Sequence, residues 1–132
     1  MQLEIVTPVR PLLTAEVDQV IIPGESGEFG VLPGHKPLLA QLGSGVLSFR
    51  EAGGNTTQLV VSGGLAEVLE DRITVLAEYA SRAEEVDLAH EQADLAQLEE
   101  KLRSGALSDD DAHRLRHDLD RTRASLAIVM RK

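Results

Sequence analysis

The chain contains no cysteine among its 132 residues. Disulfide bridges, thiolate metal sites and cysteine nucleophiles are therefore excluded. Aromatic residues are also scarce, because tryptophan is absent and the other aromatic residues are Phe29, Phe49 and Tyr79. The hydrophobic core must consequently be aliphatic, and the sequence offers no aromatic platform on which nucleic-acid bases could stack.

Long apolar runs and a surplus of positive charge are missing as well. No run approaches the roughly 20 apolar residues needed to span a bilayer. Residues 1–10 begin with a strand pattern rather than with a charged segment followed by an apolar one. The net charge of -9 disfavours nucleic acid and anionic membrane surfaces as partners. We therefore expect a cytoplasmic bacterial protein with no nucleic-acid partner and no direct membrane insertion.

Proline and glycine divide the chain near Ser81. All five prolines and ten of the eleven glycines precede this residue, and Gly105 alone follows it. Before it, apolar and polar residues alternate with the period of two that half-buried strands show. This pattern predicts a β-sandwich over residues 1–85, built as a flattened barrel of about ten short strands. The clearest strand segments are residues 3–6, 17–22, 46–50, 56–61 and 73–79.

Residues 86–132 have the spacing of helices instead. Asp87 is a candidate cap for a first helix, and Gly105 is predicted to end it in a left-handed conformation. Ser108 is predicted to cap a second helix of about 23 residues. The short connection predicts an antiparallel two-helix hairpin, so the fold class is α+β. An apolar seam with alternating steps of three and four follows the second helix at Ala112, Leu115, Leu119, Thr122, Leu126 and Val129.

The residues that could carry chemistry do not form a catalytic or metal-binding motif. The glycine-rich residues 24–30 lead into a strand with the wrong spacing for a phosphate loop. His113 and His117 are spaced to share one helix face, but the pair lacks the third ligand that a zinc site requires. No nucleophile elbow is present. We therefore expect no catalytic residues and no metal site.

Two motifs hold the strongest signal in the chain. Residues 27–38 read G-E-F-G-V-L-P-G-H-K-P-L, and residues 62–68 read S-G-G-L-A-E-V. Their glycines and prolines restrict the backbone to particular paths. The first motif resembles the G-E-x-G-x-x-P-G-H-x-P-L signature of the epsilon subunit of F-type ATP synthase, with every fixed position filled. The second is similar to the S-G-G-x-x-E-V of the same family. The resemblance covers essentially the whole chain and is strongest over residues 1–85.

The resemblance implies a non-catalytic rotor subunit in the central stalk of a proton-translocating F-type ATP synthase. Such a subunit helps to couple proton flow to ATP synthesis at the cytoplasmic face of the bacterial membrane, as a peripheral protein. Its partners would be the gamma subunit, the c-ring, and the alpha and beta subunits, which hold the catalytic sites. In the family the motif histidine meets gamma and the G-E-x-G glutamate meets the rotor ring. We therefore expect His35 at the gamma interface and Glu28 at the rotor-ring interface.

The resemblance also implies a regulatory tail over residues 86–132. In the family this tail either folds on the sandwich or extends along gamma into the catalytic head, where it inhibits ATP hydrolysis. The same apolar stripe could serve both packings, which would make the tail bistable. Candidate contacts with the catalytic subunits are the arginines of the second helix, whose ordinary alternative is pairing with nearby acids: Arg114, Arg116, Arg121 and Arg123.

Bacterial epsilon chains often bind nucleotide through the motif [IL]-D-x-x-R-A at the first tail helix. The matching residues 86–91 retain Asp87, but His90 stands in place of the arginine and Glu91 in place of the alanine. The change removes a permanent charge with phosphate-matched donors, and it adds a carboxylate that repels a polyphosphate. Asp87 and His90 thus remain candidates for a nucleotide site, while ATP binding becomes doubtful and no cofactor is expected.

Two other classes of protein would use the same elements. One is a free-standing adaptor, in which the sandwich and the helical hairpin bind another protein outside any ATP synthase. The other is a small enzyme with a cleft between sandwich and hairpin, which would need a cluster of perturbed titratable groups there. The sequence alone shows no such cluster.

Overall fold

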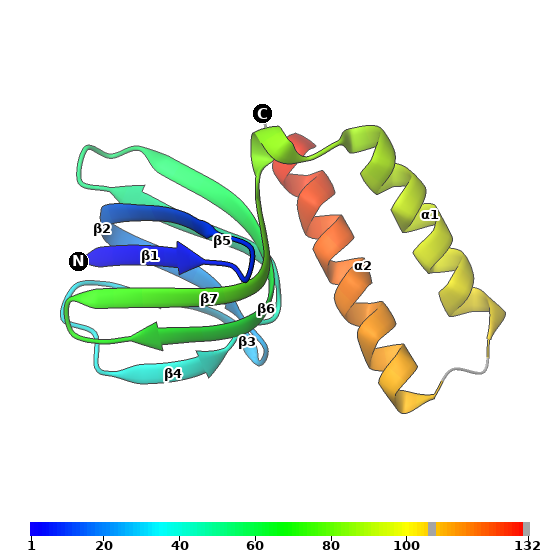
Figure 1. Ribbon diagram of the computed structural model, residues 1–132, viewed down its shortest axis with the longest axis horizontal. Helices are drawn as coiled ribbons and strands as arrows, with labels where there is room; N and C mark the ends of the chain where they lie inside the picture. The colour runs from blue at the N-terminus through cyan, green and yellow to red at the C-terminus, as the bar shows by residue number, and fades with distance from the viewer. Residues whose placement is uncertain (106–107, 131–132) are drawn as a thin grey trace.

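The computed structural model describes residues 1–105 and 108–130 and confirms the predicted α+β architecture (Figure 1). A seven-stranded sheet folds into a sandwich, and two helices lie at one end of it. A single 3₁₀ turn, η1, joins the two parts at Ala83–Glu85. The strands are β1 Gln2–Val6, β2 Pro11–Gly24, β3 Gly27–Val31, β4 Leu38–Gln41, β5 Ser44–Glu51, β6 Thr56–Val68 and β7 Arg72–Arg82, and the helices are α1 Leu88–Ser104 and α2 Asp109–Met130.

The sheet closes on itself as a flattened barrel. Its strand order is β1-β7-β6-β5-β2-β3, and β1 pairs with both β7 and β2. The pairing of β1 with β7 is parallel, whereas the other strand pairs are antiparallel. β3 extends the far half of β2, and β4 pairs with the far half of β6.

The predicted number of about ten short strands is wrong, because three of the strands are long. β2 has 14 residues, β6 has 13 and β7 has 11. β2 and β6 change partner along their length: β6 pairs with β5 from Thr56 to Ser62 and with β4 from Leu65 to Val68. A segment that the alternation pattern predicts as two short strands is therefore one long strand in the structure.

The core of the sandwich is aliphatic, as the composition requires. The predicted alternation is confirmed in β5, where Leu47 and Phe49 are buried while Arg50 is exposed. It is also confirmed in β7, where Ile73 and Val75 are buried. The remaining buried core residues are Leu3, Ile5, Val17, Val20, Ile22, Val31, Leu42, Leu59, Val61, Ala66, Val68 and Ala77.

Both predicted helix caps are present. The carboxylate of Asp87 accepts a hydrogen bond from the backbone N–H of His90 at 3.1 Å, and the hydroxyl of Ser108 accepts one from Asp111 at 3.1 Å. These side chains satisfy donors that the first turn of a helix leaves unpaired. The left-handed conformation predicted for Gly105 is wrong, because its φ of -164° and ψ of 167° are extended. Residues 106 and 107 of the predicted loop lie outside the described part of the chain.

α2 lies between the sandwich and α1 (Figure 1). Leu115, Leu119 and Thr122 of the predicted seam are buried, and Ala112 and Leu126 are half-buried. A second apolar face at Ala124 and Ile128 packs on the sandwich, and Val129 joins that cluster. α1 contains no buried residue. The hairpin is therefore attached to the sandwich mainly through α2.

The two glycines of the S-G-G motif form a bend inside β6, where Gly63 has φ +70° and Gly64 has φ +112°. These values lie in a region that L residues rarely occupy. A Cβ atom on Gly64 would also collide with the carbonyl oxygen of Leu76 on the neighbouring strand. The S-G-G sequence is therefore a structural requirement of the bend.

We predict that Gly64→Ala destabilises the sandwich by about 2 kcal/mol or more, because strained φ and a backbone collision add together. Chemical denaturation of the full chain measures this. Gly53→Ala is the matched control, since Gly53 lacks a positive φ and a Cβ there would meet nothing within 4 Å. Equal stabilities of the two variants would contradict the structural role of Gly64.

Candidate functional site

His35 lies in the loop between β3 and β4, which turns at Gly34 with φ +84°. Its ring nitrogen Nδ1 is 2.7 Å from the carbonyl oxygen of Lys36, and its backbone N–H donates to Leu32 at 3.1 Å. Because a carbonyl only accepts, this bond places the proton on Nδ1. Nε2 then remains as an acceptor on a half-buried ring held in one orientation.

Glu28 lies in β3 opposite Pro23 of β2 and is exposed. The turn that precedes it runs through Glu25 and Ser26 and reaches Gly27, whose φ is +134°. A positive φ at this position favours glycine, which explains the first residue of the G-E-x-G motif. The geometry thus presents a carboxylate on a tight hairpin at the edge of the sheet.

An exposed apolar strip crosses the sheet beside the His35 loop. Leu65 of β6 pairs with Leu76 of β7, and Leu39 of β4 pairs two positions further along β6. Cross-strand and diagonal neighbours in a sheet lie on the same face. Leu39, Leu65 and Leu76 are 66%, 44% and 51% exposed, so this strip is open to a partner. Val6 of β1 pairs with Leu76 and extends the strip.

The tail docks on the other half of the sheet through one small apolar cluster. Ala124 and Ile128 of α2 pack against Val60 of β6. Half-buried residues surround the three at the edges of the contact: Val46, Tyr79, Ala83, Val86 and Val129.

A polar contact holds the N-terminal half of α2. The Nδ1 atom of His117 is 3.0 Å from the hydroxyl of Ser44 and 3.3 Å from that of Ser62, and the two hydroxyls are 2.6 Å apart. Its Nε2 atom is 3.5 Å from a carboxylate oxygen of Glu25. One histidine therefore connects α2 to β5, to β6 and to the β2–β3 turn.

A cleft of about 870 Å³ lies between α2 and the sandwich around this contact. Acidic and basic side chains line it together with two histidines: Glu25, Glu78, Asp110, Asp118, Arg114, Arg121, His113 and His117. The guanidinium of Arg121 lies over the ring of Tyr79 at 4.9 Å, within range of a cation–π interaction. The cleft is thus polar and is built from residues of both parts of the chain.

Of the histidine pair on α2, His117 has a structural role in this arrangement. The rings of His113 and His117 are 5.9 Å apart and tilted by 36°. His117 is already engaged by Ser44 and Ser62. Within residues 1–105 and 108–130, no group of three or more His, Cys, Asp or Glu side chains is placed to hold a metal ion.

The three residues of the altered nucleotide motif interact with one another and with α1. Asp87 caps the helix, and Nε2 of His90 is 3.2 Å from a carboxylate oxygen of Asp94. Burial raises the pKa of Glu91, and the neighbouring charge of Asp94 raises it further, while Arg121 and His90 oppose the shift. Glu91 is not among the residues that line the cleft.

The four arginines of α2 have different surroundings. Arg114 and Arg121 line the cleft, while Arg123 is 3.9 Å from Glu99 of α1. For Arg123 this ion pair corresponds to the alternative role, pairing with a nearby acid. Arg116 is exposed on the side of α2 away from the cleft.

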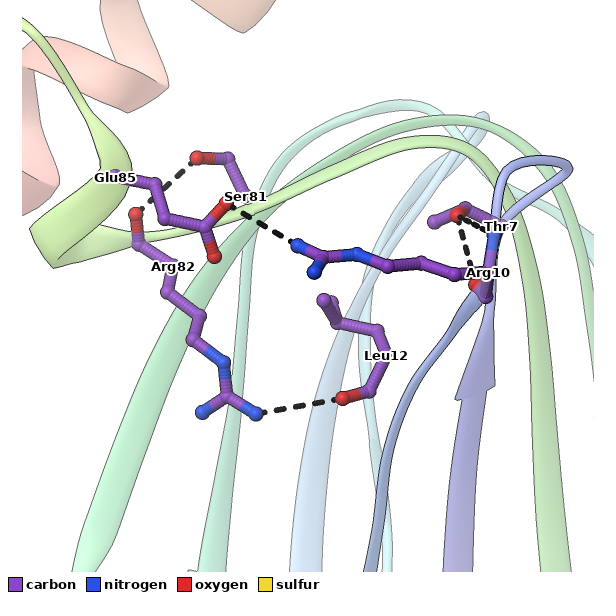
Figure 2. Close-up of polar contacts among 6 residues, drawn as sticks. All are labelled: Thr7, Arg10, Leu12, Ser81, Arg82 and Glu85. Atoms are coloured by element: carbon purple, nitrogen blue, oxygen red, sulfur yellow. Dashed lines mark hydrogen bonds and ion pairs between the residues drawn. The ribbon is translucent and has the colours of Figure 1, made fainter.

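A polar cluster pins the start of the linker to the sandwich (Figure 2). Arg10, in the β1–β2 turn, reaches Glu85 at 3.6 Å, and Arg82 donates to the carbonyl oxygen of Leu12 at 3.4 Å. The hydroxyl of Thr7 in turn donates to the carbonyl oxygen of Arg10 at 2.9 Å. β7 keeps the chain in the sheet up to Arg82, and these contacts hold η1 beside it. The connection to α1 then runs through Val86, which packs in the apolar cluster, and Asp87, which caps the helix.

Sequence reasoning missed the contact among Glu25, Ser44, Ser62 and His117. Ser44 and Ser62 are 73 and 55 residues from His117, and no local pattern connects positions so far apart. Ser62 belongs to the S-G-G motif, but nothing in the sequence shows that its hydroxyl faces a helix.

The fold and the two motifs define a class of β-sandwich proteins with a helical tail. The model of the ATP synthase delta/epsilon chain β-sandwich domain matches residues 1–83. ATP synthase epsilon chain 2 of Syntrophotalea carbinolica is 40% identical over 99% of this chain and 94% of its own length. The ATP synthase epsilon chain of Solibacter usitatus is 42% identical over 100% of this chain and 97% of its own.

Two solved structures have the same fold. One is a chain of the Euglena gracilis mitochondrial ATP synthase, in an OSCP/F1/c-ring assembly. It aligns with a TM-score of 0.81 and 27% identity, over 95% of this chain and 78% of that one. The other comes from the central stalk/c-ring of the Tetrahymena thermophila enzyme. Its TM-score is 0.68 over 98% and 96% of the two chains, and its identity of 15% supports the fold alone.

The chain therefore belongs to the ATP synthase delta/epsilon chain family, as an epsilon subunit of the F-type enzyme. It is a component of the central stalk of an enzyme complex that carries out ATP synthesis and ion transport. This membership favours the stalk subunit over a free-standing adaptor. Among the described residues, neither helix has the length and apolar character needed to cross a membrane.

We predict that Glu91→Gln raises the melting temperature at pH 7 by about 1–3 °C. The pKa of Glu91 is raised above its ordinary value of 4.5, so the folded state binds the proton more tightly than the unfolded state does. Its contribution to stability is then lost as the pH rises above 4.5 and through the folded pKa. The difference between variant and parent should shrink toward pH 4. Melting curves over this range measure it, with Glu70→Gln, on the exposed β6–β7 turn, as the matched control.

Proposed function

We propose that this chain is a non-catalytic rotor subunit of a bacterial F-type ATP synthase, peripheral at the cytoplasmic face of the membrane. Its sandwich, residues 1–85, holds the gamma subunit and rests on the c-ring, while the alpha and beta subunits hold the catalytic sites. Residues 86–132 form a regulatory domain that inhibits ATP hydrolysis. The regulatory part of the proposal rests on the small apolar cluster of Val60, Ala124 and Ile128, through which the tail packs on the sandwich.

The exposed leucine strip supports a gamma interface. Leu39, Leu65 and Leu76 form an apolar surface. Its exposure to water is unfavourable, and such surfaces mark sites of protein association. The His35 loop leads directly into β4, which contributes Leu39. In this proposal the ring of His35 uses its free Nε2 atom to accept a hydrogen bond from gamma.

We predict that Leu76→Glu weakens binding to the cognate gamma subunit at least about tenfold, as loss of a central apolar contact does. His35→Ala should weaken it by a smaller factor, because one hydrogen bond is lost. Titration by surface plasmon resonance measures both. Thr56→Glu adds the same carboxylate at the opposite end of β6 and should bind like the parent. Normal binding by Leu76→Glu would refute this interface.

Glu28 has a suitable place for the rotor-ring contact. It is exposed at the sheet edge, on a hairpin whose path is set by Gly27. An exposed carboxylate on a stiff support can meet polar groups of a ring loop without ordering a long segment first.

Three features support a tail that leaves the sandwich. α1 contains no buried residue, and the apolar contact of α2 centres on Ala124 and Ile128. Among the described residues, the buried hydroxyls of Thr122 and Ser125 on α2 have no hydrogen-bond partner. An unpaired buried hydroxyl costs about 1–3 kcal/mol, so the two groups lower the stability of the packed tail. The docked and released states therefore differ by little enough free energy for a partner to shift the balance.

The arginines of α2 are proposed to meet acidic surface on the catalytic subunits after release. Arg116 is already exposed. Arg114 is exposed too, at the edge of the cleft, and release would expose more of Arg121, which is half-buried against the sandwich. Arg123 would need only to leave an exposed ion pair with Glu99, which is worth about 0–1 kcal/mol.

We predict that the intact chain inhibits ATP hydrolysis by its cognate catalytic core several-fold, and that a chain ending at Glu85 does not. The truncation should still bind the core, because the polar cluster of Arg10, Arg82 and Glu85 remains whole. Steady-state ATPase titrations measure this. Arg121→Glu with Arg123→Glu should relieve inhibition without loss of binding. Unchanged inhibition by that variant would refute the arginine contacts, and equal activity with both chain lengths would refute the brake.

For the first tail helix we propose structural roles rather than ATP binding. Asp87 is engaged as a helix cap and His90 lies against Asp94, so neither is free to address a phosphate without breaking a contact. Glu91 places a further acid beside them.

A further inference from the structure

The contact between His117 and Glu25 joins two parts of the molecule with different proposed partners. His117 belongs to the tail, while Glu25 lies in the turn of the hairpin formed by β2 and β3. Three residues further along that hairpin is Glu28, the proposed contact with the rotor ring. The docked tail therefore touches the same turn that the ring would hold.

The hairpin is tied to the sheet by its backbone up to this turn. The N–H of Glu25 donates to Gln41 at 2.8 Å, and that of Gly43 donates to Pro23 at 2.9 Å. Gly24 has no room for a side chain, because a Cβ atom would lie 2.7 Å from the carbonyl oxygen of Gly27. The turn is thus a compact unit that carries Glu25 and Glu28 three residues apart.

The chemistry of His117 directs one nitrogen at Glu25. Nε2 faces a carboxylate, which only accepts, so this nitrogen carries a proton. Nδ1 lies within hydrogen-bond distance of the hydroxyls of both Ser44 and Ser62. The other charged groups lining the cleft around it are Glu78, Asp110, Asp118, Arg114 and Arg121, with His113 beside them.

We propose that docking of α2 and engagement of the β2–β3 hairpin by the rotor ring are positively coupled through Glu25 and His117. This inference rests on the proposed ring contact of Glu28. Each event favours the same conformation of the turn, so each raises the equilibrium constant of the other by one shared factor. A stalk in contact with its ring would then hold the tail docked, and loss of the ring contact would favour its release. The pair is partly exposed, so a factor of about two to five is expected.

The absence of cysteine makes this coupling measurable in the assembled enzyme. Dyes on Asn55→Cys, in the exposed β5–β6 turn, and Asp120→Cys, on the exposed side of α2, report docking by energy transfer. The docked-to-released ratio is measured in complexes with and without the rotor ring. We expect the ring to raise this ratio about two- to fivefold in the parent chain. Glu25→Ala or His117→Ala should abolish the rise, and Glu70→Ala should retain it.

A double-mutant cycle distinguishes loss of the Glu25–His117 interaction from a general loss of stability. The combined variant should lose no more of the ring response than either single variant, because both remove one interaction. Additive losses would overturn the proposal, as would a ring response that survives Glu25→Ala. Cross-linking of a Glu28→Cys variant to the ring tests the underlying contact independently. If the cross-link forms but the docked-to-released ratio is the same with and without the ring, the coupling alone is wrong. If no cross-link forms, the ring contact is wrong and the coupling falls with it.

Discussion

The bend at Gly63 and Gly64 in the middle of β6 is the constraint on which the rest of the structure depends. Because both residues have positive φ, one strand can leave the layer it shares with β5 and continue in the layer it shares with β4. The half before the bend carries Val60 and Ser62, where α2 docks. The half after it carries Leu65, in the strip proposed to meet gamma.

The two attachments of the tail differ in kind. Up to Glu85 the chain is tied to the sandwich by charged and backbone groups, whereas α2 is held by a few apolar side chains, one histidine and the contact of Arg121 with Tyr79. A firm joint beside a loosely held helix restricts where the chain can bend. The buried hydroxyls of Thr122 and Ser125, which have no hydrogen-bond partner among the described residues, lower the stability of the packed α2 further.

Much of the architecture was predictable from local patterns. The alternation around Leu47 and Phe49 has the period of a strand, and Asp87 and Ser108 precede helical spacing, so each element follows from residues close in sequence. The errors arose where distant residues decide the outcome. In sequence, glycines that bend one long strand look like glycines that form a turn between two strands, so the predicted number of strands is too high. Gly105 is extended, although a glycine at the end of a helix commonly adopts a left-handed conformation.

The sequence by itself determined the family, the order of elements and the two motifs, because glycine permits positive φ and proline fixes φ wherever they occur. It also determined that His35 lies in a loop, while Glu28 lies at the start of β3, beside a turn. Only the tertiary structure decided that His117 meets Glu25, since that contact joins side chains 92 positions apart through the packing of α2 on β5 and β6. Local chemistry sets the path of each segment, but which segments face one another depends on how the whole sheet closes.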